Sequence, residues 1–347
     1  MGALSVREFL MPTLGADMES GTLAAWRKQP GEMLHRGEII AEVDTDKGVI
    51  DVEVFHDGRL VEQLVEPGTK VPVGTPLARL EPVAAGEQSL PVRGVVAAGP
   101  PEERPPESAE RNERLRRATA AAMAASKRKI PHYYLATSID MHLAVDWLAS
   151  ANEGRSIEQR LLPGVLLLKA AALAAREVPE INARWEAAGG EQCGDGGRAV
   201  TSGRVHLGVA IHLKGGGLVA PALHDADRRG LDDLMQGLRD LTERVRRGRM
   251  RSSELADATL TVTSLGDRGV ERVYGVIRPP QAAVVGFGKI FERPWAVDGR
   301  VVVRPIVVAT LAADHRVSDG HRGGRYLEAI DRLLQNPQRL EQAEDRA

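Results

Sequence analysis

An internal repeat lies near the start of the chain. Residues 30–43 (PGEMLHRGEIIAEV) return 37 positions later as residues 67–80 (PGTKVPVGTPLARL). Each copy has a Pro-Gly pair, a second glycine six residues further on, and then an apolar run. This order is typical of short strands joined by tight turns, and two copies of one unit bury their apolar faces against each other. Residues 1–82 therefore predict a small all-β domain.

One lysine lies between two expected strands of this domain. Lys47 belongs to the polar stretch 44–48 (DTDKG), which follows the apolar run 39–43 and precedes the run 49–54. A hairpin tip exposes such a side chain to solvent. Most lysines in loops are simply solvated, but the chain has only 8 lysines against 38 arginines, and acids flank this one. The setting favours a lysine that becomes chemically modified.

The rest of the chain is long enough for a second domain, since 347 residues exceed what one core usually organises. A net charge of −2 gives no general attraction to nucleic acid or to an anionic membrane. The sequence has no run of ~18–20 apolar residues and no signal-peptide pattern. Its single cysteine, Cys193, cannot form an intrachain disulfide, and we interpret it as a loop residue. These features predict a cytoplasmic protein.

Residues 83–109 are rich in proline, alanine, glutamate and glycine, and predict a linker. Stretched at ~3.1 Å per residue, such a segment spans roughly 80–90 Å. Composition alone fits an unimportant spacer equally well. Residues 110–347 then predict an α/β domain. Its expected helices are 111–128, 161–178 and 231–247, and its expected strands are 205–213, 258–264, 282–286 and 301–311.

A polar heptapeptide, 314–320 (DHRVSDG), follows the apolar run 306–311 and precedes the helix expected from about residue 323. The end of a strand is a good mounting for a catalytic side chain. Histidine, with an unperturbed pKa near 6.5, accepts and returns a proton near neutral pH. The arginine clusters 114–117 and 244–247 favour solvated helix faces over phosphate binding. The glycine-rich stretches 215–217 and 286–288 lack dinucleotide-binding spacing and predict turns.

The DTDKG stretch, together with Met11-Pro12-Thr13-Leu14-Gly15 and Trp26, resembles the lipoyl domain of the acyltransferase component of 2-oxo acid dehydrogenase complexes. Biotinyl domains share this barrel-sandwich fold, but they typically flank their lysine with methionines, and none flanks Lys47. The resemblance implies lipoate attached to Lys47 by a lipoylating enzyme. Gly48 departs from the family, where alanine is commoner at that position.

The DHRVSDG heptapeptide resembles the active-site signature of the catalytic domain of the same acyltransferases, whose fold is shared with chloramphenicol acetyltransferase. Further matches are 131–134 (PHYY), 217–221 (GLVAP) and 261–266 (TVTSLG). The resemblance implies a multidomain chain, with a small all-β lipoyl domain before an α/β chloramphenicol-acetyltransferase-like domain. It implies no metal.

The resemblance also implies roles for individual residues. His315 is expected to be the general base that deprotonates a thiol, of CoA or of the dihydrolipoyl arm. Thr263 is the expected hydroxyl donor to the oxyanion, and neighbouring Ser264 is the alternative. Asp319 is expected to hold the loop or orient His315. Asp314 and Arg316 are expected to form a buried scaffolding pair.

The implied function is transfer of an acyl group from the chain's own lipoyl arm to CoA. Acetyl is the first choice, as in pyruvate dehydrogenase, with branched-chain or acetoin-derived groups as alternatives. The implied partners are the decarboxylase and dihydrolipoamide dehydrogenase components, and the implied assembly is a homotrimer, with larger cages left open. No subunit-binding domain is recognisable in the linker. A non-catalytic lipoylated scaffold is the rival interpretation, and an acyltransferase with a free small acceptor would leave Lys47 unexplained.

Overall fold

A computed structural model describes residues 7–14, 18, 20–45, 48–82, 107–188, 196–213, 217–266 and 269–341. Lys47, Cys193 and most of the expected linker (83–106) lie outside these ranges. The chain divides into two compact units. The first comprises residues 1–118 with 215–217 and 248–252, and the second comprises all the others. No helix in the described ranges is both long and apolar enough to cross a membrane.

The first unit is built from two sheets, which are antiparallel except where β16 pairs with β5. Strands β1, β8, β6 and β3 form one sheet, and β5, β4, β2 and β7 form the other, with β16 parallel to β5. Alternate side chains along each strand point into the space between the sheets, and the resulting core includes Leu23, Ile40, Val52 and Leu77, all fully buried. The strands are β1 (Arg7–Leu10), β2 (Ser20–Trp26), β3 (Met33–Leu34), β4 (Ile39–Thr45), β5 (Gly48–Glu53), β6 (Gly58–Gln63), β7 (Lys70–Pro72), β8 (Pro76–Pro82) and β16 (Arg249–Arg251).

The internal repeat is confirmed in the backbone of the first unit. The equivalent glycines Gly31 and Gly68 have φ of 95° and 89°, and each donates its N–H to a carbonyl of a neighbouring strand 2.6 Å away. Gly37 and Gly74, the second equivalent pair, have φ of 87° and 84°. Positive φ is accessible to glycine without steric cost. Each copy of the repeat therefore makes the same two turns.

Strands β4 and β5 form the expected hairpin. Their last antiparallel pair is Thr45 opposite Gly48. Only residues 46 and 47 connect the two strands, the loop length that is commonest in hairpins. Lys47 thus belongs to the connection between β4 and β5, outside the described residues.

The second unit is an α/β domain with one large sheet. The sheet order is β15-β12-β17-β18-β20-β19, and β9 pairs with the second half of β20. Its strands are β9 (His132–Asp140), β12 (Leu207–Val209), β15 (Ala222–Leu223), β17 (Leu260–Ser264), β18 (Ala283–Phe287), β19 (Phe291–Val297) and β20 (Arg300–Asp314). Two small pairs accompany it: β10 (Ala183–Ala187) with β11 (Gly197–Thr201), and β13 (Ile211–His212) with β14 (Leu218–Val219).

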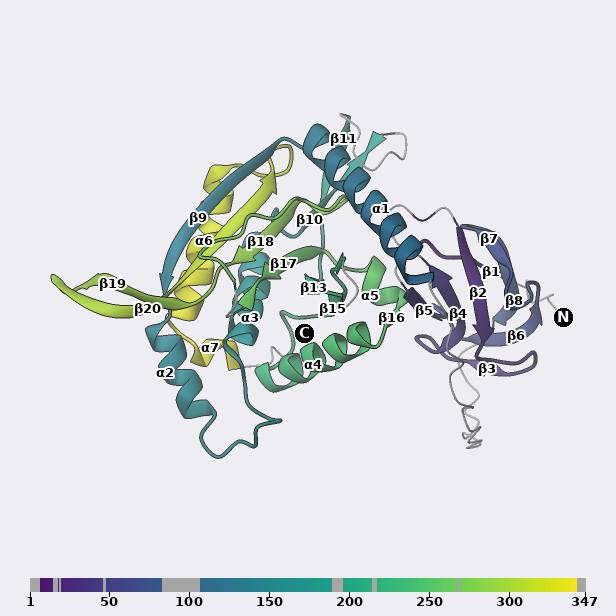
Figure 1. Ribbon diagram of the computed structural model, residues 1–347, viewed down its shortest axis with the longest axis horizontal. Coiled ribbons are helices and arrows are strands. Elements are labelled where there is room, and N and C mark those ends of the chain that lie inside the picture. Colours follow the sequence, from purple (N-terminus) through teal and green to yellow (C-terminus); the bar gives the residue numbers. More distant parts are fainter. Residues whose placement is uncertain are drawn as a thin grey trace. The chain divides into compact units, whose positions relative to one another are not determined.

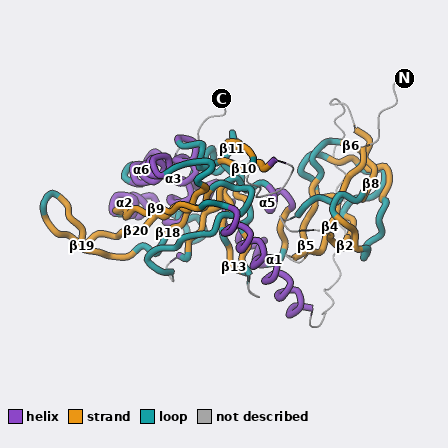
Figure 2. The backbone as a smooth tube through the Cα atoms, turned by 90° about the horizontal axis from the view of Figure 1, so that it is seen from above, coloured by secondary structure: helices purple, strands orange, loops and turns teal. Residues whose placement is uncertain are grey.

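Helices α3 and α6 lie side by side against this sheet, while β19 and the first half of β20 form a hairpin that extends away from it (Figures 1 and 2). The helices are α1 (Glu107–Lys129), α2 (His142–Ala151), α3 (Pro163–Glu177), α4 (Leu231–Arg246), α5 (Ser252–Ala256), α6 (Gly320–Leu334) and α7 (Gln338–Glu341). The three expected helices are confirmed, although α1 begins four residues before the expected start at 111, within the stretch assigned to the linker.

A buried lysine ties α3 to the turn that precedes α4. Lys169 is fully buried, and its Nζ donates to the carbonyl oxygens of Asp227 at 2.7 Å and Arg229 at 2.6 Å. Burial lowers the pKa of Lys169 to about 8, against the opposing effect of the Asp227 carboxylate. This lysine is a structural residue of the core.

Candidate active site

The histidine of the heptapeptide directly follows β20, an inner strand of the large sheet. The last nine residues of β20, 306–314, are all buried, as expected for a strand covered on both faces. Asp314 ends the strand, residues 315–317 form a turn, and α6 begins at Gly320. The side chain of His315 is exposed on this turn, next to fully buried Asp314. The expected strand, turn and helix order is confirmed.

Asp314 and Arg316 form the expected pair. The Asp314 carboxylate accepts from Arg316 Nε at 3.0 Å and from Nη2 at 2.7 Å, and also from the Arg316 backbone N–H at 2.9 Å. The guanidinium lies over the ring of Trp185 on β10, with Cζ 4.5 Å from the centroid. Bidentate ion pairing and stacking on an aromatic face suit arginine specifically. The pair fixes both residues that flank His315.

Replacing Arg316 by leucine is expected to lower the free energy of unfolding by ~3–5 kcal/mol, because it leaves the buried Asp314 carboxylate without its counter-ion. Urea unfolding followed by far-ultraviolet circular dichroism measures the change. The double variant Arg316→Leu/Asp314→Asn also removes the unpaired buried carboxylate. It is expected to recover part of the lost free energy of unfolding. A loss below ~1 kcal/mol in the single variant would contradict the scaffolding role.

Asp319 serves as the N-cap of α6. Its Oδ1 accepts the backbone N–H of Arg322 at 2.9 Å. This hydrogen bond to the helix N-terminus holds the pKa of Asp319 below its usual value. The carboxylate is therefore ionised at neutral pH and fixes where the helix begins, five residues after His315. The structure thus gives Asp319 a loop-holding contact at the start of α6.

Residues around the start of β9 contact the histidine turn. The backbone N–H of His315 donates to the carbonyl of Pro131 at 2.9 Å. The neighbouring His132 bonds to the Ile130 carbonyl through Nδ1 and accepts the Ile277 N–H at Nε2. Burial lowers the pKa of His132, and so does nearby Lys127. His132 is thus a neutral structural histidine that supports the turn.

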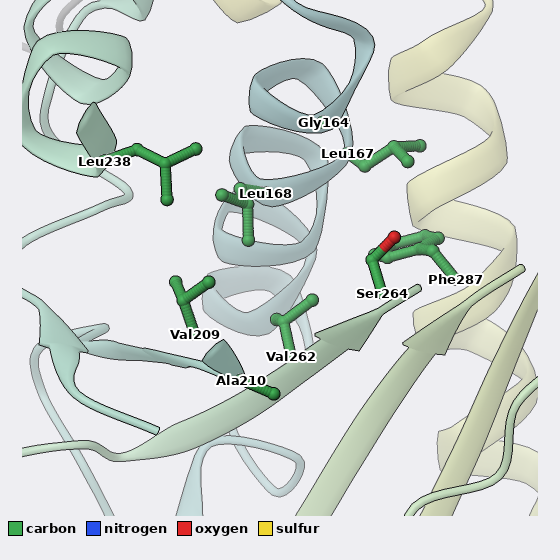
Figure 3. Close-up of a pocket in the computed structure, with 9 residues that line it drawn as sticks. All are labelled: Gly164, Leu167, Leu168, Val209, Ala210, Leu238, Val262, Ser264 and Phe287. Atoms are coloured by element: carbon green, nitrogen blue, oxygen red, sulfur yellow. The ribbon is translucent and has the colours of Figure 1, made fainter. Parts of the chain in front are cut away.

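Thr263 lies in β17, between two residues that face α3. An apolar cavity of about 130 Å³ lies between α3, α4 and the sheet, and it is lined by Val262 and Ser264 among others (Figure 3). Because successive strand residues point to opposite faces, Thr263 points away from this cavity. The two candidate hydroxyl donors, Thr263 and Ser264, therefore face opposite sides of the sheet.

Thr263 and His315 lie at opposite ends of the sheet within one chain. Thr263 is opposite Gly286 in the parallel pair β17–β18, and Gly286 is opposite Thr310 in the antiparallel pair β18–β20. Strand β20 continues from Thr310 to Asp314 before His315 follows. Thr263 and His315 are therefore separated by five residues along the strands, ~17 Å, and by two strand spacings across them, ~10 Å. One acyl carbon cannot contact both side chains of the same chain.

Two contacts of the histidine turn were not anticipated from the sequence. Trp185, on β10, stacks on Arg316, and Tyr133, on β9, contacts the ring of His315 and the hydroxyl of Ser318. Tyr133 belongs to the PHYY motif, which marked this segment as similar to the family. The local sequence did not indicate which residues Tyr133 would contact. Within the described ranges, no group of three or more His, Cys, Asp or Glu side chains could hold a metal ion.

Family models match both units of the chain. A model of the catalytic domain of 2-oxoacid dehydrogenase acyltransferases matches residues 104–341, and a biotin/lipoyl model described as biotin-requiring enzyme matches residues 7–80. Among curated relatives, the acetyltransferase component of the pyruvate dehydrogenase complex of Rickettsia bellii is 24% identical, covering 95% of this chain and 97% of its own. The lipoamide acyltransferase component of the branched-chain alpha-keto acid dehydrogenase complex of Pseudomonas aeruginosa is 28% identical, covering 95% and 98%.

Solved structures agree with these matches. A probable dihydrolipoamide acetyltransferase of Listeria monocytogenes is 25% identical, with a TM-score of 0.58, over 76% of this chain and 99% of its own. The dihydrolipoamide acetyltransferase of Azotobacter vinelandii, studied for the roles of a serine, a histidine and an asparagine in catalysis, is 25% identical, with a TM-score of 0.59, over 73% and 99%. The chain therefore belongs to the family of 2-oxoacid dehydrogenase acyltransferases, with a biotin/lipoyl-type domain ahead of its catalytic domain.

Proposed function

We propose that this chain transfers an acyl group between a dihydrolipoyl group on its own Lys47 and the thiol of CoA. The observation that supports this proposal best is the position of His315. Its imidazole is exposed, while the Asp314–Arg316 ion pair and the Asp319 N-cap hold the turn on either side of it. Acetyl is the proposed acyl group, in line with the name of the Rickettsia bellii relative. The Pseudomonas aeruginosa relative, named for a branched-chain complex, keeps branched acyl groups as the alternative.

In the proposed reaction, His315 takes the proton from the attacking CoA thiol. The thiolate attacks the carbonyl carbon of the acyl thioester, a carbon–sulfur bond forms, and the carbonyl oxygen becomes an oxyanion. The Thr263 hydroxyl donates to this oxyanion, a type of contact worth ~3–4 kcal/mol in the transition state. The original carbon–sulfur bond then breaks, and the leaving thiolate receives the proton back from His315. Asp319 holds the start of α6.

The geometry of one chain supports a shared active site. His315 and Thr263 lie at opposite ends of the sheet, so we propose that His315 of one subunit works with Thr263 of the next in a homotrimer. A cyclic trimer is a closed assembly in which every subunit contributes both residues, each to a different site. The decarboxylase and dihydrolipoamide dehydrogenase components are the proposed partners in a larger complex.

The proposed carrier is the lipoyl domain, residues 1–82, which lies within the first unit. The two-residue connection between β4 and β5 suits a lysine that must be reached by other proteins, because it belongs to the end of a hairpin. When bound there, lipoate supplies a dithiol that carries the acyl group as a thioester. Residues 83–109 are proposed as the tether to the acyltransferase domain, 110–347, without a subunit-binding domain between them. The proposed setting is a reducing cytoplasm, and the single cysteine of the chain supports it.

The first test measures acyl transfer from acetyl-, isobutyryl- and succinyl-CoA to free dihydrolipoamide by the full chain. We expect transfer with a preference for acetyl-CoA. Co-expression of His315→Ala and Thr263→Ala chains then tests the shared site. Each variant alone is expected to be nearly inactive, but random mixing in a cyclic trimer makes about one quarter of the interfaces intact. The mixed protein should recover about that fraction of the activity.

A matched control uses the double variant Thr263→Ala/His315→Ala mixed with wild type. The shared site predicts about one quarter of the wild-type activity in a one-to-one mixture, whereas a site within one chain predicts about one half. The shared site would be contradicted if the mixture of the two single variants recovered no activity and the mixture of wild type with the double variant kept one half of the wild-type activity. No transfer from any acyl-CoA by folded, trimeric wild type would contradict the enzyme and favour the non-catalytic scaffold.

A further inference from the structure

The imidazole of His315 is exposed on a turn, where few contacts hold a side chain. A general base must lie within about 3 Å of the proton it removes, and a displacement of ~1 Å can cost about 10²-fold in rate. The bond from the His315 N–H to the Pro131 carbonyl fixes the main chain of the turn. That bond does not fix the direction of the ring.

Tyr133 provides a contact to the ring itself. It lies on β9 opposite Ala313 of β20, two residues before the histidine. Its ring meets the imidazole of His315 edge to face, with centroids 5.2 Å apart and planes at 66°. Aromatic pairs are favourable in this geometry at centroid distances of ~4.5–7 Å. The contact restricts rotation of the His315 side chain.

The hydroxyl of Tyr133 is bonded to the other end of the turn. It lies 2.8 Å from Oγ of Ser318, a nearly buried residue. The backbone N–H of Ser318 in turn donates to the Asp314 carbonyl at 3.0 Å. One tyrosine therefore contacts the histidine ring and also closes the turn that carries it. Both contacts join residues more than 180 positions apart in the sequence.

Helix α6 leaves space for this tyrosine. A Cβ built on Gly323 would lie 2.9 Å from the Tyr133 hydroxyl oxygen, closer than real Cβ contacts come. The absence of a side chain at Gly323 thus lets the hydroxyl rest against the helix. Burial raises the pKa of Tyr133, so its hydroxyl keeps its proton at neutral pH and the bond to Ser318 persists.

We propose that Tyr133 is the positioning residue of the transfer reaction: its ring orients the imidazole of His315, and its hydroxyl bond to Ser318 fixes the turn. The inference rests on the proposed acyl transfer and names no new reacting group. Tyr133 acts through His315, by keeping the imidazole nitrogen where the thiol proton is removed. The expected effect of its loss is on kcat, with the KM of both substrates unchanged.

The test uses the full chain with acetyl-CoA and dihydrolipoamide. Tyr133→Phe and Ser318→Ala are each expected to lower kcat by about 3- to 10-fold, as for the loss of one hydrogen bond. The double variant is expected to lose no more than the larger single loss, because both remove the same bond. Tyr133→Leu, which also removes the ring, is expected to lose about 10-fold more. Tyr134→Phe, on the other face of β9, is the matched control and should keep its kcat.

A second readout follows the histidine ring directly. In protein labelled with carbon-13 at histidine Cε1, the His315 resonance is identified by its loss in His315→Gln. This resonance should move in Tyr133→Leu and stay nearly in place in Tyr133→Phe, which keeps the aromatic ring. Because loss of the tyrosine's ring current alone moves the resonance, the three-bond couplings between Hα and Hβ of His315 are measured as well. They should change to rotamer-averaged values in Tyr133→Leu if the ring orients the imidazole, and stay as in wild type if the role is merely structural.

Wild-type kcat in Tyr133→Leu, or losses that simply add in the double variant, would overturn the inference while leaving acyl transfer established. An unmoved His315 resonance in Tyr133→Leu would also overturn it. Absence of transfer by the wild type would contradict the proposed function instead. In that case the His315 couplings in Tyr133→Leu still decide whether the tyrosine orients the ring.

Discussion

Replacing His315 by alanine is expected to lower kcat for acyl transfer from acetyl-CoA to dihydrolipoamide by at least ~10²-fold, the usual effect of removing a positioned general base. The loss should appear in kcat and not in KM, because the imidazole acts on the thiol proton in the transition state, whereas other groups bind CoA. The side chain is exposed, so its truncation removes no core contact. Steady-state rates with both substrates varied measure the change.

His142→Ala is the matched control. His142 is also a partly exposed histidine, but it begins α2 and pairs with Asp146 of the same helix. Its loss should leave the transfer rate within twofold of wild type. A His315→Ala protein that keeps the wild-type kcat, with the fold intact by circular dichroism, would contradict the assignment of the base.

Replacing Lys47 by arginine is expected to abolish turnover of the 2-oxo acid in the assembled complex while sparing acyl transfer to free dihydrolipoamide. An arginine cannot be acylated at this position by an enzyme that joins lipoate to a primary amine, so the tethered carrier is lost. The catalytic residues lie in the other unit and keep their contacts. The two rates are measured on the same preparation, together with the intact mass of the chain.

Lys70→Arg, at an exposed position on β7 of the same unit, is the control and should keep both rates and the added mass. Loss of both activities in Lys47→Arg would contradict the separation of carrier and catalyst. Retention of complex turnover would show that another group carries the acyl chain. A scaffold without catalysis predicts no transfer to free dihydrolipoamide by any of these proteins.

The first unit was predictable because its repeat constrains the backbone locally. Gly31, Gly37, Gly68 and Gly74 are all at positive φ, and the sequence marks each of them by a glycine in the same place of a repeated pattern. Apolar runs also located the hairpin β4–β5. The prediction that Lys47 is exposed falls outside the described residues.

Element boundaries in the second unit were predicted less well. Residues 205–213 were expected to form one strand, but β12 and β13 belong to different sheets. The Ala210 N–H donates to the Val262 carbonyl between them, so the path of the chain depends on a partner 52 residues away. Helix α1 begins at Glu107, directly after two prolines, which favour a helix start. Proline content had assigned these residues to the linker instead.

The histidine turn was predictable as a motif, because strand, turn and helix are adjacent in sequence. Its supports were not, since Trp185 and Tyr133 reach it only through tertiary packing. The distance between Thr263 and His315 depends on the direction of β20 relative to β18, which no local pattern records. These are long-range properties, and the fold alone determines them.

The opposite placement of Thr263 and His315 on one sheet has a genetic consequence. In a shared-site trimer, a chain lacking both residues disables the two reaction centres that it borders, leaving one of three intact. A chain lacking only one of them disables a single centre. Alleles of the two kinds would therefore differ in dominance when expressed beside the normal copy. The allele lacking both residues would be the more severe one. It would lower the total activity by a larger fraction than the fraction of subunits that carry it.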